Sequence, residues 1–227
     1  APVGDLVVAD HQQGADAPSV VWTNNHHLYF QVSTMGDVRL YAASLEGEMY
    51  PATGEDEHVY GYDVAESGEF ALVTVSTPTS VGELYVHTIS TGERQALTSF
   101  NKAFEDEVEL VAAEPLMYKG AKDFDVHGWL MKPAGYVDGE KYPIIVEIHG
   151  GPHAMFANTL FHELHLLAAQ GYGVLYLNPR GSHGYSQQFV DSVRGDYGGD
   201  DYQDIMDGLD SVLADHEWID QSRLGVT

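Results

Sequence analysis

The 227-residue chain contains no cysteine, which excludes disulfides and thiolate metal sites. Basic residues are also scarce, because 10 Lys and Arg face 35 Asp and Glu, for a formal charge of −25. A nucleic-acid partner needs a basic face, so that class of partner is excluded. No stretch approaches the roughly 20 apolar residues of a membrane span, so no membrane partner is expected. The lack of cysteine is compatible with a cytoplasmic protein.

Hydrophobic residues make up 44% of the chain, enough for a substantial core. The length allows one large domain or two small ones. The acidic residues are scattered rather than clustered, which indicates a strongly solvated surface, and a salt-adapted source organism is one explanation. The start at Ala1 rather than at a methionine suggests a chain cut at its N-terminus.

The first half, residues 1–110, has the pattern of an all-β structure, with short apolar runs between turn-forming residues. It contains an internal repeat, in which Leu40-Tyr41 and Leu84-Tyr85 recur about 44 residues apart. That period predicts two four-stranded blades from the C-terminal part of a β-propeller. The alternative is a β-sandwich with chance similarity between the two segments.

The second half, residues 111–227, alternates predicted strands and helices. A strand hairpin is expected at 116–119 and 124–131, followed by strands at 143–148, 173–178 and 224–226 and helices at 159–170 and 200–215. Nearly continuous apolar strands between helices are typical of a buried parallel sheet. The fold class predicted for this half is therefore a doubly wound α/β sheet.

Residues 149–152, His-Gly-Gly-Pro, carry the strongest functional signal. They follow the apolar strand at 143–148, and glycine lets the backbone turn sharply and come close to a ligand. A backbone N–H aimed at a developing oxyanion needs no side chain, which suits Gly151 as an oxyanion-hole donor. His149 and Gly150 are predicted to contact substrate beside it. The alternative is an ordinary glycine turn.

A second polar stretch follows the strand at 173–178, where ligands bind in such sheets. Arg180 could hold a substrate carboxylate or lock the loop through an internal ion pair, and Tyr185 could line a pocket or simply pack. Ser182 lacks a G-x-S-x-G frame and is a poor nucleophile candidate.

Two further polar groups have structural interpretations. Acidic residues between Asp196 and Asp201 precede a predicted helix and are expected to cap it. His162 and His165 are three residues apart, whereas a zincin helix places its histidines four apart, so both are expected on the helix surface or in packing. No metal site and no cofactor are predicted.

The last residues, 224–227, have the pattern of a strand beginning. In an α/β-hydrolase the nucleophile serine stands on a sharp turn right after such a strand. We therefore expect the serine elbow beyond Thr227, and expect this fragment by itself to be inactive.

Together these stretches resemble the prolyl oligopeptidase family of serine peptidases, and more narrowly its acylaminoacyl-peptidase branch. The resemblance covers about residues 111–227 and rests on 142–143, 149–152, 178–182, 184–185, Phe189, 197–200, Asp204 and 220–226. It implies an N-terminal β-propeller, an α/β-hydrolase domain of which residues 111–227 form the N-terminal part, and hydrolysis of short peptides by a Ser-Asp-His triad. Proline-specific members usually carry Tyr where His149 stands, so the histidine favours the acylaminoacyl type.

Two alternative interpretations assign the protein a different function. One is a non-catalytic propeller binding protein with a degenerate hydrolase domain, and the coding sequence after Thr227 would distinguish it. The other is an esterase, which a panel of acyl esters and acyl peptides would separate. The oligomeric state is left open, with a homo-oligomer among the alternatives.

Overall fold

A computed structural model describes residues 5–10 and 20–227 of the chain. The chain divides into two compact units. Unit 1 consists of Ala1–Val108 together with Ala157–Leu160, and unit 2 consists of Glu109–Phe156 and Phe161–Thr227. The assignment of 1–110 to propeller blades and of 111–227 to a hydrolase domain stays a prediction. Each unit is described by itself.

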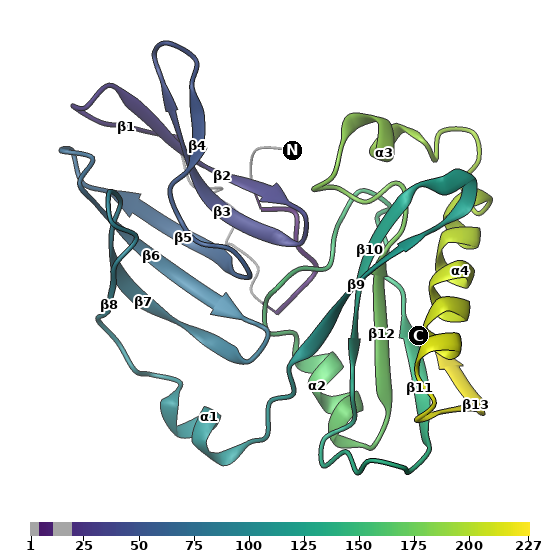
Figure 1. Ribbon diagram of the computed structural model, residues 1–227. Coiled ribbons are helices and arrows are strands. Elements are labelled where there is room, and N and C mark those ends of the chain that lie inside the picture. The colour runs from purple at the N-terminus through teal and green to yellow at the C-terminus, as the bar shows by residue number, and fades with distance from the viewer. Residues whose placement is uncertain (1–4, 11–19) are drawn as a thin grey trace. The chain divides into compact units, whose positions relative to one another are not determined.

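Unit 1 is built from two antiparallel sets of four strands (Figure 1). The first set comprises β1 (Val21–Trp22), β2 (His27–Thr34), β3 (Asp37–Ser44) and β4 (Met49–Pro51). The second comprises β5 (His58–Val64), β6 (Phe70–Thr77), β7 (Ser80–Thr88) and β8 (Arg94–Ala96), and helix α1 (Lys102–Glu107) follows it. A single parallel residue pair, Val38 with His58, joins the two sets.

The sequence repeat corresponds to this division. Leu40-Tyr41 lies in β3 and Leu84-Tyr85 lies in β7, the third strand of each set. Apolar side chains from both sets share one core, in which Leu40 and Val59 are fully buried. The two similar sequence segments therefore form the two similar four-stranded sets of unit 1, whereas a propeller remains a prediction.

Unit 2 is a mixed five-stranded sheet with helices. Its elements are β9 (Ala113–Lys119), η1 (Ala121–Asp123), β10 (Asp125–Met131), β11 (Tyr142–Glu147), α2 (His162–Ala169), β12 (Gly173–Asn178), α3 (Gln187–Asp191), α4 (Asp200–Asp215) and β13 (Ile219–Val226). The strand order is β13-β11-β12-β10-β9. The first three strands are parallel and the last two antiparallel to their neighbours. The α/β character predicted for this half is confirmed, with an antiparallel hairpin at one side.

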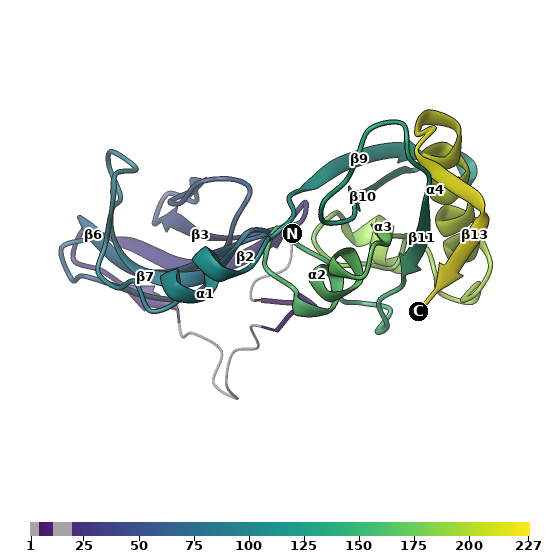
Figure 2. The same cartoon turned by 90° about the horizontal axis from the view of Figure 1, so that it is seen from below.

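Helices cover both faces of this sheet because side chains alternate along each strand. On one face, Ile144 and Val146 of β11 pack with Val212 of α4. On the other, Tyr176 of β12 contacts Phe156, whose ring neighbours that of Phe161 at the start of α2. Figure 2 shows α2 and α4 separated by the sheet in a second view.

Helix α2 is shorter than predicted. The apolar spacing suggested a helix over 159–170, but α2 begins at His162. The backbone N–H of Leu160 donates to Ser76 Oγ, at 3.2 Å, and the Thr159 hydroxyl donates to the same oxygen, at 3.1 Å. These contacts hold both residues in unit 1 and outside the helix. Within the described part of the chain, every helix is too short or too polar to cross a membrane.

Candidate active site

Two loops meet at one edge of the five-stranded sheet. Residues 148–156 follow β11, and residues 179–186 follow β12. The two strands are parallel neighbours, so both loops leave from their carboxyl ends. In open α/β sheets this is the edge at which ligands bind.

Gly151 lies in the first loop with its backbone exposed. Its φ is +136°, a conformation that favours glycine, and a Cβ there would stand 2.8 Å from the His153 nitrogen. Among the described residues, the Gly151 N–H has no hydrogen-bond partner. An exposed, unpaired donor at the end of a central strand has the properties that an oxyanion hole requires.

The end of β13 lies beside this turn. The Thr227 N–H donates to the Val146 carbonyl, and the Ile148 N–H donates to the Thr227 carbonyl, each at 3.1 Å. These bonds continue the parallel pairing of β13 with β11 past the last strand residue. Thr227 is therefore a backbone neighbour of Ile148, three residues from Gly151.

The turn is tied to the second loop by several hydrogen bonds. The Asn178 side chain accepts from the Phe156 N–H at 2.8 Å and donates to the Phe156 carbonyl at 2.9 Å. The His153 Nδ1 lies 2.8 Å from the Gly181 carbonyl, and the His183 N–H donates to the Ala154 carbonyl at 3.0 Å. The end of β12 and the loop after it thus hold residues 153–156 of the first loop in place.

His149 connects the two loops through its ring. Its Nδ1 lies 3.0 Å from the Gly150 carbonyl oxygen, and its Nε2 lies 3.0 Å from Ser182 Oγ. The ring also stands edge-on to Phe156, with centroids 5.0 Å apart. Burial lowers the pKa of His149 below its ordinary value, which favours a neutral ring.

The Ser182–His149 pair is not a nucleophile and base. Ser182 is only 1% exposed, so a substrate carbonyl has no access to its hydroxyl. The other ring nitrogen of His149 faces a backbone carbonyl, whereas a catalytic triad places a carboxylate there. This agrees with the sequence, in which Ser182 lacks an elbow frame.

Arg180 lies in an internal ion pair. Its Nε and one terminal nitrogen each donate to Asp204, both at 2.8 Å, and the other terminal nitrogen donates to Asp200 at 3.1 Å. The guanidinium also stacks over Phe124, 4.7 Å from the ring centroid. Arg180 is 2% exposed and Asp204 is fully buried. The geometry supports the loop-locking role rather than a substrate contact.

Tyr185 belongs to a buried polar network under the same loops. Its hydroxyl accepts from Asn178 Nδ2 at 2.8 Å and lies 3.0 Å from His127 Nδ1. Burial lowers the pKa of His127 to about 4, so the ring is neutral and accepts the tyrosine proton. The Tyr185 ring packs on Phe189, at 5.0 Å between centroids.

The remaining polar candidates have local roles. Asp196 accepts from the Asp200 N–H at 3.2 Å, at the start of α4, as expected of a capping residue. His162 and His165 lie on α2.

The sequence does not indicate the part played by His127 or the burial of Asp204. Neither carries a local signal, because the partners of both lie 24 or more residues away along the chain.

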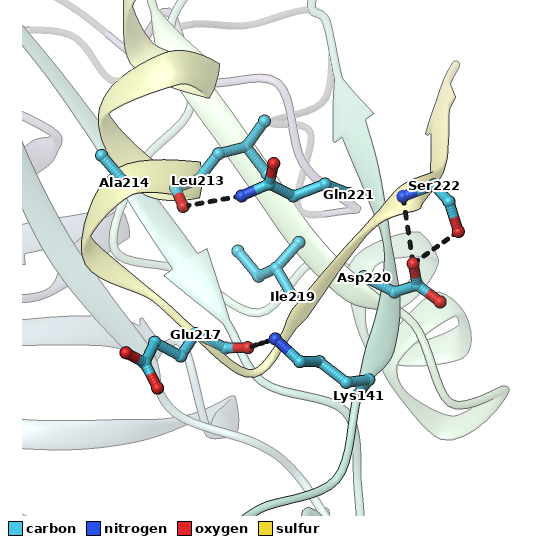
Figure 3. Close-up of a pocket in the computed structure, with 8 residues that line it drawn as sticks. All are labelled: Lys141, Leu213, Ala214, Glu217, Ile219, Asp220, Gln221 and Ser222. Atoms are coloured by element: carbon cyan, nitrogen blue, oxygen red, sulfur yellow. Dashed lines mark hydrogen bonds between the residues drawn. The ribbon is translucent and has the colours of Figure 1, made fainter.

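A separate hollow lies at the opposite edge of the sheet. It is lined by Lys141, Leu213, Ala214, Glu217, Ile219, Asp220, Gln221 and Ser222 (Figure 3). Lys141 precedes β11, so the six residues of that strand, roughly 20 Å, separate the hollow from the turn. The amino ends of the strands are not where this fold class binds its substrates.

Comparisons with known proteins relate the whole chain to peptidases. Residues 158–227 match the prolyl oligopeptidase family. An uncharacterized peptidase of Bacillus subtilis, YuxL, is 38% identical over 226 residues, which cover 99% of this chain and 34% of the relative. A dipeptidyl-peptidase 5 of Porphyromonas gingivalis is 26% identical, over 87% of this chain and 29% of the relative.

Solved structures give a consistent result. An acylaminoacyl peptidase of Pyrococcus horikoshii superposes with a TM-score of 0.79 at 32% identity, over 89% of this chain and 31% of that protein. An acylaminoacyl peptidase in complex with Z-Gly-Gly-Phe-chloromethyl ketone superposes with a TM-score of 0.80, with the same identity and coverage. The chain spans about a third of the length of these relatives.

Proposed function

Because the chain belongs to the prolyl oligopeptidase family, we propose that it forms part of a serine peptidase that hydrolyses short peptides of the acylaminoacyl or dipeptidyl type. In this proposal the turn at residues 149–152 supplies one donor of the oxyanion hole. The Gly151 N–H would hydrogen-bond the substrate carbonyl oxygen as it gains negative charge.

One observation carries the proposal. The unpaired N–H of Gly151 lies in the turn that follows β11, and the end of β13 pairs with the last residues before that turn, at the carboxyl edge of the parallel strands. A nucleophile elbow stands directly after such a strand in α/β-hydrolases, and the residue after the serine gives the second oxyanion donor. A serine in that place would attack a carbonyl whose oxygen is within reach of Gly151.

The triad itself would come from residues outside these 227. No serine of the chain stands in a G-x-S-x-G frame, and the Ser182–His149 contact is buried. We therefore expect the 227 residues alone to hydrolyse acyl-peptide substrates at no more than the low level that an oxyanion site retains without a triad. The two four-stranded sets of unit 1 would belong to a β-propeller.

The test is a substrate panel on the natural protein that contains these residues. It compares N-acyl-peptide, dipeptidyl and free aminoacyl p-nitroanilides with acyl esters of matched side chains. Faster hydrolysis of the peptide substrates, blocked by a serine-directed fluorophosphonate, is expected. Activity on esters alone would support an esterase, and absence of all hydrolysis would overturn the proposal.

A further inference from the structure

Two histidine rings lie beside each other where the two loops of the carboxyl edge meet. His153 belongs to the loop after β11 and His183 to the loop after β12, and their ring centroids are 5.5 Å apart. The backbone between them is tied, because the His183 N–H donates to the Ala154 carbonyl at 3.0 Å. Neither ring has a part in the function proposed above, which uses the backbone donor of Gly151.

The His153 ring is held in one tautomer by the second loop. Its Nδ1 lies 2.8 Å from the Gly181 carbonyl oxygen. A carbonyl oxygen can only accept, so Nδ1 carries a proton and, in a neutral ring, Nε2 keeps its lone pair. Among the described residues, this Nε2 has no hydrogen-bond partner. A histidine that binds a metal through one nitrogen usually donates its other ring N–H to a carboxylate, a water or a backbone carbonyl, as His153 does.

The His183 ring can supply a second nitrogen. The residue is half-buried, and neither ring nitrogen has a hydrogen-bond partner in the part of the chain that the structure describes. A flip of the ring therefore exchanges its two nitrogens without breaking a hydrogen bond. Burial lowers the pKa of His183 below its ordinary value, and the neighbouring His153 lowers it further. Both effects favour the neutral ring that a metal ion requires.

The separation of the two rings suits two ligands of one ion. Zinc–nitrogen bonds are about 2.0–2.1 Å long, so the centroids of two imidazoles bound at a tetrahedral angle stand about 5 Å apart. The observed separation of 5.5 Å is close to that value. Across residues 5–10 and 20–227, no group of three or more His, Asp or Glu side chains is arranged to hold a metal. An ion held by this pair would therefore complete its coordination with water.

We propose that His153 and His183 form a two-histidine site for a divalent transition-metal ion of the zinc, nickel or copper type. Imidazole nitrogen suits these ions, whereas Mg²⁺ and Ca²⁺ take oxygen ligands. Two protein ligands hold an ion through fewer bonds than the four of a structural zinc site, so we expect a chelator to remove it readily. The inference does not rest on the proposed peptidase activity, because it uses two side chains and no catalytic step.

Calorimetric titration of Zn²⁺ into the chelator-treated natural protein tests the site. Excess Mg²⁺ in the buffer occupies exposed carboxylates without competing for imidazole. The unchanged protein should bind one more Zn²⁺ than His153→Gln or His183→Gln. The double variant should lose no more than either single variant, because both nitrogens are needed. An unchanged stoichiometry in His183→Gln would overturn the inference and show that the two rings only pack against each other.

His27→Gln is the matched control. The Nδ1 of His27 also lies near a backbone carbonyl, 2.9 Å from that of Asn25, but its ring contacts among the described residues are with Tyr29 and Tyr50 rather than with a histidine. This variant should keep the full stoichiometry. A loss equal to that in His183→Gln would mean that single imidazoles bind the ion, and the inference would be wrong.

Crystals of the natural protein soaked in Zn²⁺ give a readout independent of the binding heat. An anomalous peak should lie about 2.0–2.1 Å from Nε2 of His153 and from one ring nitrogen of His183. A peak bonded to only one of the two rings, or no peak at either, would overturn the two-histidine site.

Discussion

The two edges of the five-stranded sheet differ in how their polar groups are held. At the carboxyl edge, Asn178, Arg180 and Ser182 are each at most 2% exposed and are satisfied by partners from distant parts of the chain. At the amino edge, Lys141 and Asp220 lie near the surface around a hollow, where Lys141 donates to the Glu217 carbonyl and Asp220 accepts from Arg223. Buried polar groups need their partners, whereas exposed ones have water as a substitute. The carboxyl edge is therefore the more rigid of the two, as a preorganised site requires.

The largest effect expected is that of breaking the buried ion pair at the carboxyl edge. Arg180→Met leaves the Asp204 carboxylate buried without its counter-charge, which should lower the free energy of unfolding by about 3–5 kcal/mol. Urea unfolding followed by Trp129 and Trp218 fluorescence measures it, since both side chains lie in unit 2.

The matched control lies at the other edge. Arg223 pairs with Asp220, where the side chains are 52% and 26% exposed. Arg223→Met should change stability far less, because water solvates the remaining carboxylate. Equal losses in the two variants would mean that burial does not distinguish the two edges.

The second effect is a pH dependence from His127. The folded protein holds this ring neutral with a pKa of about 4, below the ordinary value of 6.5. Below about pH 6.5 the unfolded chain binds a proton that the folded chain does not, so stability falls with pH until about 4 and levels off below it. The full loss is about 3 kcal/mol. His127→Gln should flatten the fall between pH 6.5 and 4 in urea titrations, and an unchanged slope would contradict the burial argument.

Much of the backbone at the carboxyl edge of the sheet could be predicted from the sequence, because the residue patterns that form its strand and turn are local. The apolar run before residues 149–152 predicts β11, and the glycines predict the turn at its end. Helix α4 begins and ends at the predicted residues because its apolar spacing is regular. The predicted start of α2, at residue 159, is wrong, because hydrogen bonds from Thr159 and Leu160 to Ser76, more than 80 residues away, override the local helical pattern.

Side-chain partners could not be predicted in the same way. Arg180 allowed a substrate contact or an internal ion pair, and the choice depends on Asp204 in another element. For Ser182 the sequence bears only on a role as nucleophile, because its spacing gives no indication of His149. Hydrogen bonds between loops depend on how the strands are ordered, which no single stretch of sequence specifies.

The third-largest effect is expected from a substitution in the turn at residues 149–152. Gly151→Val places a Cβ against the His153 nitrogen at a φ that valine does not favour, so the N–H should lose its orientation. In the natural protein kcat should fall about 100-fold or more, the scale of one lost oxyanion donor. Stability should change less, because Gly151 is exposed at a strand end.

His149→Phe is the companion to this variant. It removes the ring nitrogens but keeps the backbone donor, so a smaller fall in kcat is expected than for Gly151→Val. If His149→Phe were the more damaging change, with both variants folded by circular dichroism, the imidazole rather than the amide would be the oxyanion ligand.

The smallest effect is expected at the amino edge. Lys141 donates to the Glu217 carbonyl at the rim of the hollow, and its removal leaves only an exposed backbone oxygen that water can solvate. Lys141→Ala should therefore change the free energy of unfolding by no more than about 0.5 kcal/mol, as is usual for surface positions. It should also leave kcat and KM of the natural protein unchanged, because β11 separates it from Gly151 by its whole length. A clear loss of peptide hydrolysis in Lys141→Ala, with stability retained, would show that the hollow takes part in substrate binding. The functional contrast between the two edges would then be wrong.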